Sequence, residues 1–470
     1  MKRSTLLVLL TLCTLLATAQ DSTRTLSLRE VYRLVLDHHP VAKQAALLPD
    51  AARAELRMAR GMFDPVLKSG FDEKNFEGKE YWKSWENSLV VPVWFGTDIK
   101  AGFDNSRGPY LDSERVTPGQ GLSFLGVSVP LGQGLLIDER RATVRQAQLL
   151  GTLAAAEQIK LINKLLLQVN KDYLDWTYAF TRLQWHEESL RLAEVRFDAI
   201  RMRVLFGDQP AIDSLEALIE VQNRENIRNQ SLLDFTNARL IMSNHLWSPE
   251  GAPLEMTTEV VPTFEGTVID TLDAVSLNAM LDSANSNHPE LVKLRTKLQG
   301  LEIEKRWAAE KLRPKLNLDY NFLAPRADGL LENGLQPIYQ ENYKMGLSFR
   351  MPLFLREERG KLNLMKIKMN QTEQEQLQTN REITNQVRAA YNELNNLGLQ
   401  LRIQQQQLEN AEKLLAGELY KFENGESFLF LVNSRENAVI NSRIKLAELK
   451  AKYGKSRAFL SWSAGRLIAE

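Results

Sequence analysis

The feature that most limits the fold of this chain is a pair of long stretches without proline. No proline occurs between Pro130 and Pro210, and none follows Pro352. Both stretches are rich in Ala, Leu, Gln, Lys, Arg and Glu, and their apolar residues recur every three or four positions, as on one side of an α-helix. One such stripe consists of Leu161, Leu165, Val169, Tyr173 and Trp176. We expect helices over residues 137–206 and 357–422, each on the order of 100 Å long at 1.5 Å per residue.

Each long helix is expected to turn back at a glycine. Gly207 is followed by a second periodic stretch over residues 211–246, and Gly425 is followed by another over 427–466. Periodic helices of this length are typical of coiled-coil packing. A cytoskeletal or signalling coiled coil would explain these helices, but it would not explain the duplication and the strand segments of the same chain.

The sequence pattern occurs twice. The dipeptide His-Pro ends at Pro40 and again at Pro289, 249 residues later, and Pro65 and Pro314 are separated by the same 249 residues. A fixed period of this kind indicates a duplicated structural unit. The expected unit is a helix, a strand segment, a very long helix, a tight turn and a second long helix.

The first copy is longer than the second. Pro130 and Pro352 occupy equivalent strand ends but lie only 222 residues apart, so the first copy has 27 additional residues between its strands. These residues are expected to form one more β-hairpin, which turns at residues 94–97. We place the two copies at residues 20–264 and 265–470.

Alternating residues predict the strands, at about 65–132 in the first copy and about 315–353 in the second. Runs near ten residues with one apolar side suit an outer-membrane β-barrel, although a soluble antiparallel sheet alternates equally well. Four to six strands cannot close a membrane barrel alone. A barrel would therefore need strands from several chains.

The first 19 residues are expected to be a signal peptide. A basic start is followed by the apolar run from Leu6 to Leu16 and by Ala17-Thr18-Ala19, which is typical of a cleavage site. The only cysteine, Cys13, lies in this segment, and Leu12 precedes it where a lipoprotein signal needs a small residue. The exported chain is therefore expected to lack disulfides.

The overall composition excludes several classes of function. The net charge is zero with 25% charged and 44% hydrophobic residues, so the chain is not a disordered tail and has no electrostatic reason to bind nucleic acid. After the signal segment, no run of about 20 apolar residues predicts a transmembrane helix.

The order of elements, the two copies and two particular stretches resemble the TolC family of outer-membrane efflux proteins. The stretches are "HPELVKLRTKLQGLEIEKRWAAEKLRPKLNL" (288–318) and "YKFENGESFLFLVNSRENAVINSRIKLAEL" (420–449). The strand end Ser348–Leu353 also resembles the family. The resemblance covers about residues 27–466. It implies a mainly α-helical homotrimer with a shared β-barrel in outer-membrane lipid, of four or six strands per protomer, continued by a coiled-coil tunnel across the periplasm. It also implies two partners, a periplasmic adaptor protein and an inner-membrane transporter.

By this resemblance, the turns at Gly207 and Gly425 form the periplasmic tip, where the tunnel narrows and the adaptor docks. Glycine suits the left-handed residue that ends a helix. Asp208 and Glu426 follow the two glycines and are expected to favour the positive N-terminus of the next helix.

The family's best-known constriction uses acidic residues six and nine positions after the second glycine. Those positions are Leu431 and Ser434 here, whereas the equivalent first-copy positions carry Asp213 and Glu216. An acidic ring would therefore come from the first copy or be missing, and two solvated acids on a helix face are an equal alternative. At the second turn, Phe428, Phe430 and Leu431 have two possible roles. They form an apolar gate, or they pack between helices.

No residues are assigned to catalysis, a cofactor or a metal. The sequence contains no nucleophile elbow, phosphate loop or Cys/His cluster. His38 and His39 are adjacent on the chain and so point in different directions, and the second copy has a single histidine at the same place. We interpret His-Pro as the point where a helix restarts, with proline in the first turn.

The expected function is a passive outer-membrane exit duct with a gate near residues 200–215 and 418–432. The alternatives are a duct dedicated to type I protein secretion and a periplasmic coiled-coil scaffold without a pore.

Overall fold

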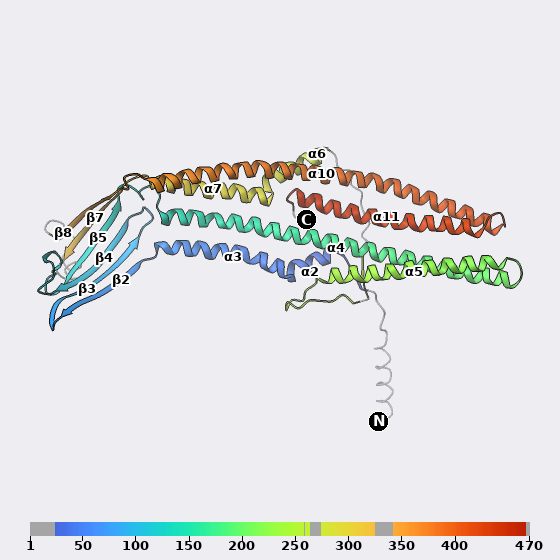
Figure 1. Ribbon diagram of the computed structural model, residues 1–470, viewed down its shortest axis with the longest axis horizontal. Coiled ribbons are helices and arrows are strands. Elements are labelled where there is room, and N and C mark those ends of the chain that lie inside the picture. The colour runs from blue at the N-terminus through green and yellow to red at the C-terminus, as the bar shows by residue number, and fades with distance from the viewer. Residues whose placement is uncertain (1–23, 258, 264–273, 325–341, 467–470) are drawn as a thin grey trace, which may run out of the picture. The chain divides into compact units, whose positions relative to one another are not determined.

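The computed structural model describes residues 24–257, 259–263, 274–324 and 342–466 (Figure 1). These residues form two compact units. Unit 1 contains the described residues up to Ala45, residues 159–288 and the described residues from Glu382, and unit 2 contains residues 46–158 and 289–381. Each unit takes elements from both sequence copies, so the compact units do not coincide with the repeats.

Unit 2 contains a six-stranded antiparallel sheet in the order β2-β3-β4-β5-β7-β8. The pairing of β5 with β7 joins strands from the two copies. The bounds of the strands are β2 Val66–Phe76, β3 Lys79–Pro92, β4 Asp98–Arg107, β5 Leu122–Pro130, β7 Lys315–Ala324 and β8 Tyr343–Arg350.

Two tight turns explain why the first copy contributes four strands. Glu77 and Gly78 both have positive φ, at 52° and 74°, which is the backbone of the two-residue hairpin turn that matches strand twist. The predicted additional hairpin is confirmed. Its turn follows β3 and is closed by a hydrogen bond from the N–H of Val93 to the carbonyl of Thr97, at 2.8 Å. Residues 79–85 of β3 lie between 65–76 and 86–106, the alternating segments on which the strand prediction rests.

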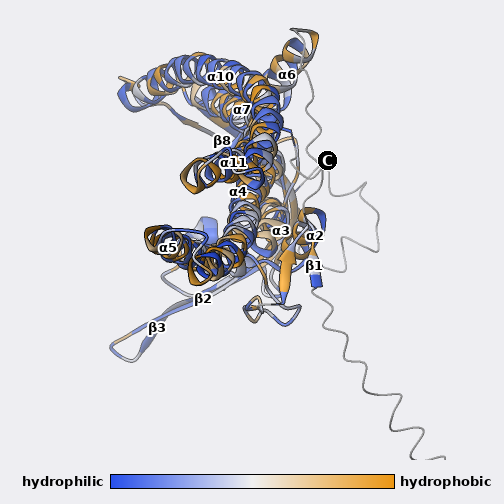
Figure 2. Ribbon diagram, turned by 90° about the vertical axis from the view of Figure 1, so that its right-hand side faces the viewer, coloured by the Kyte–Doolittle hydropathy of each residue, from blue (hydrophilic) through white to orange (hydrophobic). Residues whose placement is uncertain are grey.

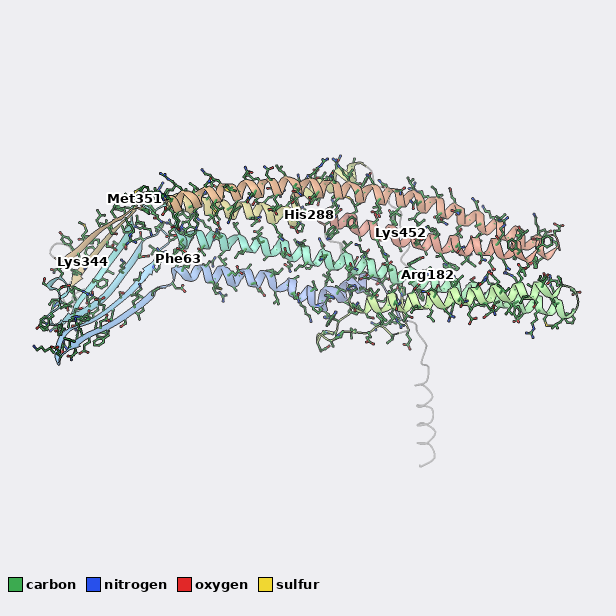
Figure 3. All side chains as sticks on the ribbon, in the orientation of Figure 1. Phe63, Arg182, His288, Lys344, Met351 and Lys452 are labelled. Atoms are coloured by element: carbon green, nitrogen blue, oxygen red, sulfur yellow. The ribbon has the colours of Figure 1, made fainter. Side chains whose placement is uncertain are left out.

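The two middle-length helices of unit 2 follow the prediction. Helix α3 (Pro40–Arg60), most of which lies in this unit, leads into β2, and α7 (Pro289–Glu310) leads into β7. Phe63 marks the junction of α3 with β2, and Met351 marks the junction of β8 with the next helix (Figure 3). Helices α4 (Glu139–Leu205) and α10 (Arg356–Glu423) begin in unit 2. Their bounds confirm the two very long helices that the sequence predicts.

Unit 1 holds the rest of α4 and α10 together with α2 (Leu28–His38), α5 (Ala211–Ser243), α6 (Ala274–Asn287) and α11 (Leu429–Ser463). Its largest core uses the apolar stripe of α4, where Trp176 and Val169 are fully buried. A short parallel pair, β1 (Arg24–Leu26) with β6 (Val260–Pro262), was not predicted. The Tyr173 hydroxyl lies 2.9 Å from the carbonyl oxygens of Leu26 and Thr263 and so ties this pair to α4.

None of the helices in the described ranges is long and apolar enough to cross a membrane. Hydrophilic and hydrophobic residues alternate along α10 and α11 (Figure 2). The expected signal peptide, its cleavage site and Cys13 lie outside the residues that the structure describes.

Candidate functional site

The turns at Gly207 and Gly425 lie at the same end of unit 1 (Figure 1). Both glycines have positive φ, at 76° and 77°, and an added Cβ would meet no atom within 4 Å. In each turn the glycine N–H donates to the carbonyl three residues earlier at 3.1 Å, and the next N–H donates to the carbonyl five residues earlier at 2.9 Å. These are the two hydrogen bonds of a Schellman motif, so glycine is needed for its backbone conformation rather than for space.

The acidic residues after the glycines do not serve as helix caps. The N-cap positions of α5 and α11 are Pro210 and Phe428, and neither makes a side-chain capping hydrogen bond. Asp208 and Glu426 therefore do not cap the next helix, and the expectation that their charge favours its positive N-terminus stays a prediction. The reason for the missing cap is geometric, because each acid lies two residues before the cap, where it is exposed to solvent.

The apolar residues of the second turn divide into two groups. Phe428 and Phe430 are 77% and 67% exposed within the single chain. Leu429 between them is buried against Ile200 and Ala217. Packing between helices therefore uses Leu429, which the sequence interpretation did not single out, and it leaves the two phenylalanines on the surface. Leu431 is half-buried.

The four positions of the expected constriction lie on the first turns of α5 and α11. Asp213 is half-buried, whereas Glu216 and Ser434 are exposed. Within the described part of the chain, neither acid has an ion-pair partner. Two acidic side chains per chain are thus available to face a neighbouring surface.

A buried ionic cluster ties α4, α5 and α11 together behind the turns. Arg196 and Arg224 each lie 2.8 Å from Oε2 of Glu436, and the side chains of Arg224 and Glu436 are only 4% and 7% exposed. Arg224 also lies 2.8 Å from Oε1 of Glu220 and donates to the carbonyl of Ser189 at 2.9 Å. Because every charge in this cluster has a partner, its burial is tolerated.

The cluster lowers the pKa of its buried carboxylate, that of Glu436. Burial alone would raise the pKa of Glu436, but the hydrogen bond and charge of Arg196, together with those of Arg224, outweigh burial and hold the pKa below its ordinary value of 4.5. Glu436 is therefore ionised at neutral pH.

The His-Pro sites have the structural role expected of them. Pro40 and Pro289 are the first residues of α3 and α7. The Nδ1 atom of His39 accepts a hydrogen bond from the N–H of Val41 at 3.1 Å, so this histidine caps α3. Among the described residues, no group of three or more His, Cys, Asp or Glu side chains is arranged to hold a metal ion.

The sheet of unit 2 has two chemically different faces. Residues paired across neighbouring strands point to the same side, and on one side the register aligns apolar residues across all six strands. Leu67 on β2 and Leu347 on β8 are 77% and 64% exposed. We call this side the apolar face; its apolar residues are Leu67, Phe71, Trp85, Leu89, Val91, Ile99, Ala101, Phe103, Leu125, Val127, Val129, Leu316, Leu318, Tyr320, Phe322, Tyr343, Met345, Leu347 and Phe349.

The opposite side carries most of the charges and is called the polar face. Lys100 and Asp319 form an ion pair of 2.8 Å across it, and Lys344 and Arg350 lie on β8 with the same orientation. Lys344 is seen on the sheet in Figure 3. An exposed apolar surface that crosses six strands is far larger than a soluble domain ordinarily leaves uncovered.

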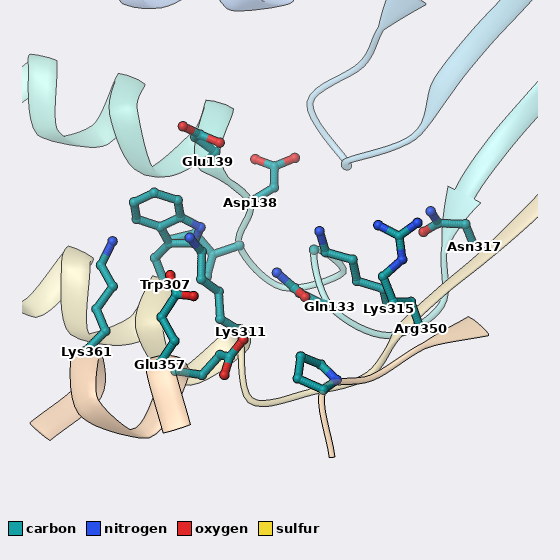
Figure 4. Close-up of a pocket in the computed structure, with 14 residues that line it drawn as sticks. Gln133, Asp138, Glu139, Trp307, Lys311, Lys315, Asn317, Arg350, Glu357 and Lys361 are labelled. Carbon is teal, nitrogen blue, oxygen red and sulfur yellow. The ribbon is translucent and has the colours of Figure 1, made fainter. Parts of the chain in front are cut away.

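A cavity of about 440 Å³ lies where the sheet meets its helices (Figure 4). Trp307 on α7 is contacted by the ammonium groups of Lys311 and Lys361, at 4.1 and 4.7 Å from the ring centroid. The charges in the lining balance, with four cations and four acids. They are Lys311, Lys315, Arg350, Lys361, Asp138, Glu139, Glu357 and Glu358. The cavity therefore has no preference for ions of one sign.

Comparison with known proteins gives one family and several solved structures. A family model described as outer membrane efflux protein matches residues 280–466. A search of curated protein sequences finds no match.

The solved structures share the fold over nearly the whole chain. The open-state MtrE outer membrane channel of Neisseria gonorrhoeae is 13% identical with a TM-score of 0.68, covering 96% of this chain and 94% of that one. The VceC outer membrane protein of Vibrio cholerae is 14% identical with a TM-score of 0.63, covering 94% and 96%. The Campylobacter jejuni CmeC outer membrane channel is 14% identical with a TM-score of 0.63, covering 93% and 85%. The second part of the chain is therefore similar to the outer membrane efflux protein family, and the chain shares its fold with these outer-membrane channels.

Proposed function

We propose that the protein is a passive outer-membrane exit duct of a multicomponent efflux or secretion system. The observation that carries the proposal is the six-stranded sheet, which has an uncovered apolar face, a polar face and two open edges. In water, an exposed apolar face and open strand edges would promote aggregation. In a membrane, the apolar face would contact lipid, and each edge strand would pair with the sheet of another protomer.

The number of strands supports a trimer. Among the residues that the structure describes, strands β2 and β8 are each paired on one side only. Three copies of the six-stranded sheet would supply eighteen strands, and barrels of about 16–18 strands leave an aqueous channel. The polar face would then line the channel, which performs no chemistry and selects by diameter and charge.

The helical elements would continue this channel through the periplasm. The proposal places the turns at Gly207 and Gly425 at the inner end, where an adaptor protein and an inner-membrane transporter would deliver the substrate. Asp213 and Glu216 from each protomer of the trimer would form the acidic ring of the entrance. The exposed Phe428 and Phe430 would contribute apolar surface beside it. We further propose that residues 1–19 are removed on export and that residues 20–264 and 265–470 are duplicated units.

Electrical recording in a planar bilayer tests the pore. The purified trimer should insert and conduct ions in discrete steps, because the polar faces would enclose water. A scaffold without a pore would give no steps. The Glu216→Gln variant should lower the preference for cations, whereas Glu225→Gln, which changes an exposed acid nine residues further along α5, should not. Absence of conductance from a correctly assembled trimer would contradict the proposal.

A further inference from the structure

A second cavity in unit 2, of about 340 Å³, has a strongly unequal charge. It lies between the last turn of α7, the first turns of α4 and the segment that joins β5 to α4. Its lining consists of three arginines, one acid and three apolar side chains, which are Arg145, Arg306, Arg313, Glu310, Leu136, Ile137 and Ala309.

The single acid is already engaged. Glu310 is 4% exposed; its Oε1 accepts the N–H of Leu136 at 3.2 Å, and its Oε2 lies 3.4 Å from Nη1 of Arg313. Arg306 pairs with Glu302, which is outside the lining, at 3.2 Å. Arg145 has no ion-pair partner in the described ranges. With Arg306 and Arg313 each facing one acid, the cavity has one guanidinium group in excess, that of Arg145. Guanidinium groups bind phosphate through two parallel hydrogen bonds.

The cavity adjoins the apolar face. The N–H of Leu131 donates to the carbonyl of Leu316 at 2.6 Å, which extends the pairing of β5 with β7 beyond Pro130. Leu131 is 46% exposed and follows Val127 and Val129 on the apolar side of β5. Five residues later, Leu136 is 60% exposed and lines the cavity. Apolar surface thus leads from the sheet to a cluster of arginines at its helix end.

We infer that this cavity binds the phosphate of an anionic phospholipid in the periplasmic leaflet of the outer membrane. The inference rests on the proposed function, because it requires the apolar face to lie in lipid. A basic pocket at the border of a membrane-embedded surface is suited to an acidic lipid headgroup. A lipid, rather than free phosphate, is indicated by the exposed Leu131 and Leu136, which would contact the beginning of an acyl chain.

Titration of the purified trimer with short-chain lipids tests the inference. The probes are dioctanoyl phosphatidylglycerol, dioctanoyl phosphatidylethanolamine and inorganic phosphate, with bound lipid counted by native mass spectrometry. The test variant is Arg145→Gln with Arg306→Gln, which leaves the Arg313–Glu310 pair intact. The control is Arg381→Gln, which removes an exposed arginine of α10 outside the cavity.

The wild type should bind about one phosphatidylglycerol per protomer, at least tenfold more tightly than phosphatidylethanolamine. The double variant should lose at least tenfold of this affinity, the control should stay within twofold, and phosphate should not displace the lipid. Equal binding by the double variant, or displacement by phosphate at equal concentration, would overturn the inference.

The same samples separate this inference from the proposed function. A trimer that conducts ions but does not discriminate between the two lipids would refute the lipid site alone. A protein that neither inserts nor conducts would refute the membrane role of the sheet and the lipid site with it.

Discussion

Placing a charge on the two faces of β8 should have opposite consequences. Leu347 lies on the apolar face opposite Leu318, and Ser348, the next residue, lies on the polar face opposite Asn317. Leu347 is the fifth of eight residues in β8 and so lies about 10 Å or more from either strand end, at 3.4 Å per residue. If the apolar face is in lipid, Leu347→Arg places a guanidinium near the bilayer midplane.

The expected cost of Leu347→Arg is about 2–4 kcal/mol in each protomer, the range for arginine on the lipid face of a membrane strand at this depth. Ser348→Arg should change stability by only about 0.5 kcal/mol, because its side chain would enter water. Met351→Arg should also cost about 0–1 kcal/mol. Met351 follows the end of β8 that leads into α10, so its side chain would lie near the membrane–water interface.

Urea unfolding of the three variants in phospholipid vesicles, followed by tryptophan fluorescence, measures these differences. The decisive comparison is between Leu347→Arg and Ser348→Arg, because the two changes are chemically alike and adjacent in the chain. Equal destabilisation by both, or a larger effect of Ser348→Arg, would refute the assignment of the two faces.

Four further predictions concern the turns and the ionic cluster. Glu436→Gln should destabilise the protein by about 3 kcal/mol, the lower end of the range for a buried pair that loses one partner, because Arg224 keeps Glu220; a melting temperature equal to that of the wild type would contradict this. Since the pKa of Glu436 is lowered on folding, the stability that its carboxylate contributes should be complete above pH 4.5 and be lost as the pH falls through the lowered value. Melting curves from pH 7 to 3 should therefore show a smaller loss of stability at acid pH in Glu436→Gln than in the wild type. Gly425→Ala should cost about 1–2 kcal/mol through its positive φ, whereas Gly417→Ala, inside α10, should not destabilise in the same thermal scan. Oxidation of a variant carrying Asp213→Cys and Leu431→Cys should abolish export but not assembly, with recovery on reduction, and unchanged export by a visibly cross-linked trimer would exclude a gate at these positions.

The elements that could be predicted from the sequence are those with a local signal. The period of 3.6 and the absence of proline specify α4 and α10, and a glycine after each helix specifies the turn. The alternation of the strands and the 27-residue difference between copies specified the additional hairpin. These features depend on neighbouring residues, so one sequence was sufficient.

The first part of β3 could not be predicted because its pattern lacks one apolar side. Residues Lys79–Trp85 mix lysines, a glutamate and aromatic side chains, and their strand structure depends on pairing with β2 and β4. The β1–β6 pair was missed because three-residue strands more than 230 residues apart have no local signal.

The candidate site was predicted in position but not in its contacts. The two turns and their glycines were identified, whereas the ionic cluster was not, because Arg196, Arg224 and Glu436 each resemble a solvated charge in the sequence. Only the packing of α4, α5 and α11 brings the three side chains together. Asp208 does not cap α5, because the length of the turn places Pro210 at the cap position.

The most direct test of an outer-membrane duct is the size and location of the protein after membranes are separated and extracted with detergent. The proposed function predicts a heat-sensitive trimer in the outer-membrane fraction, released by detergent but not by salt or alkali. A monomer or dimer released without detergent would contradict the shared barrel and, with it, the transport function.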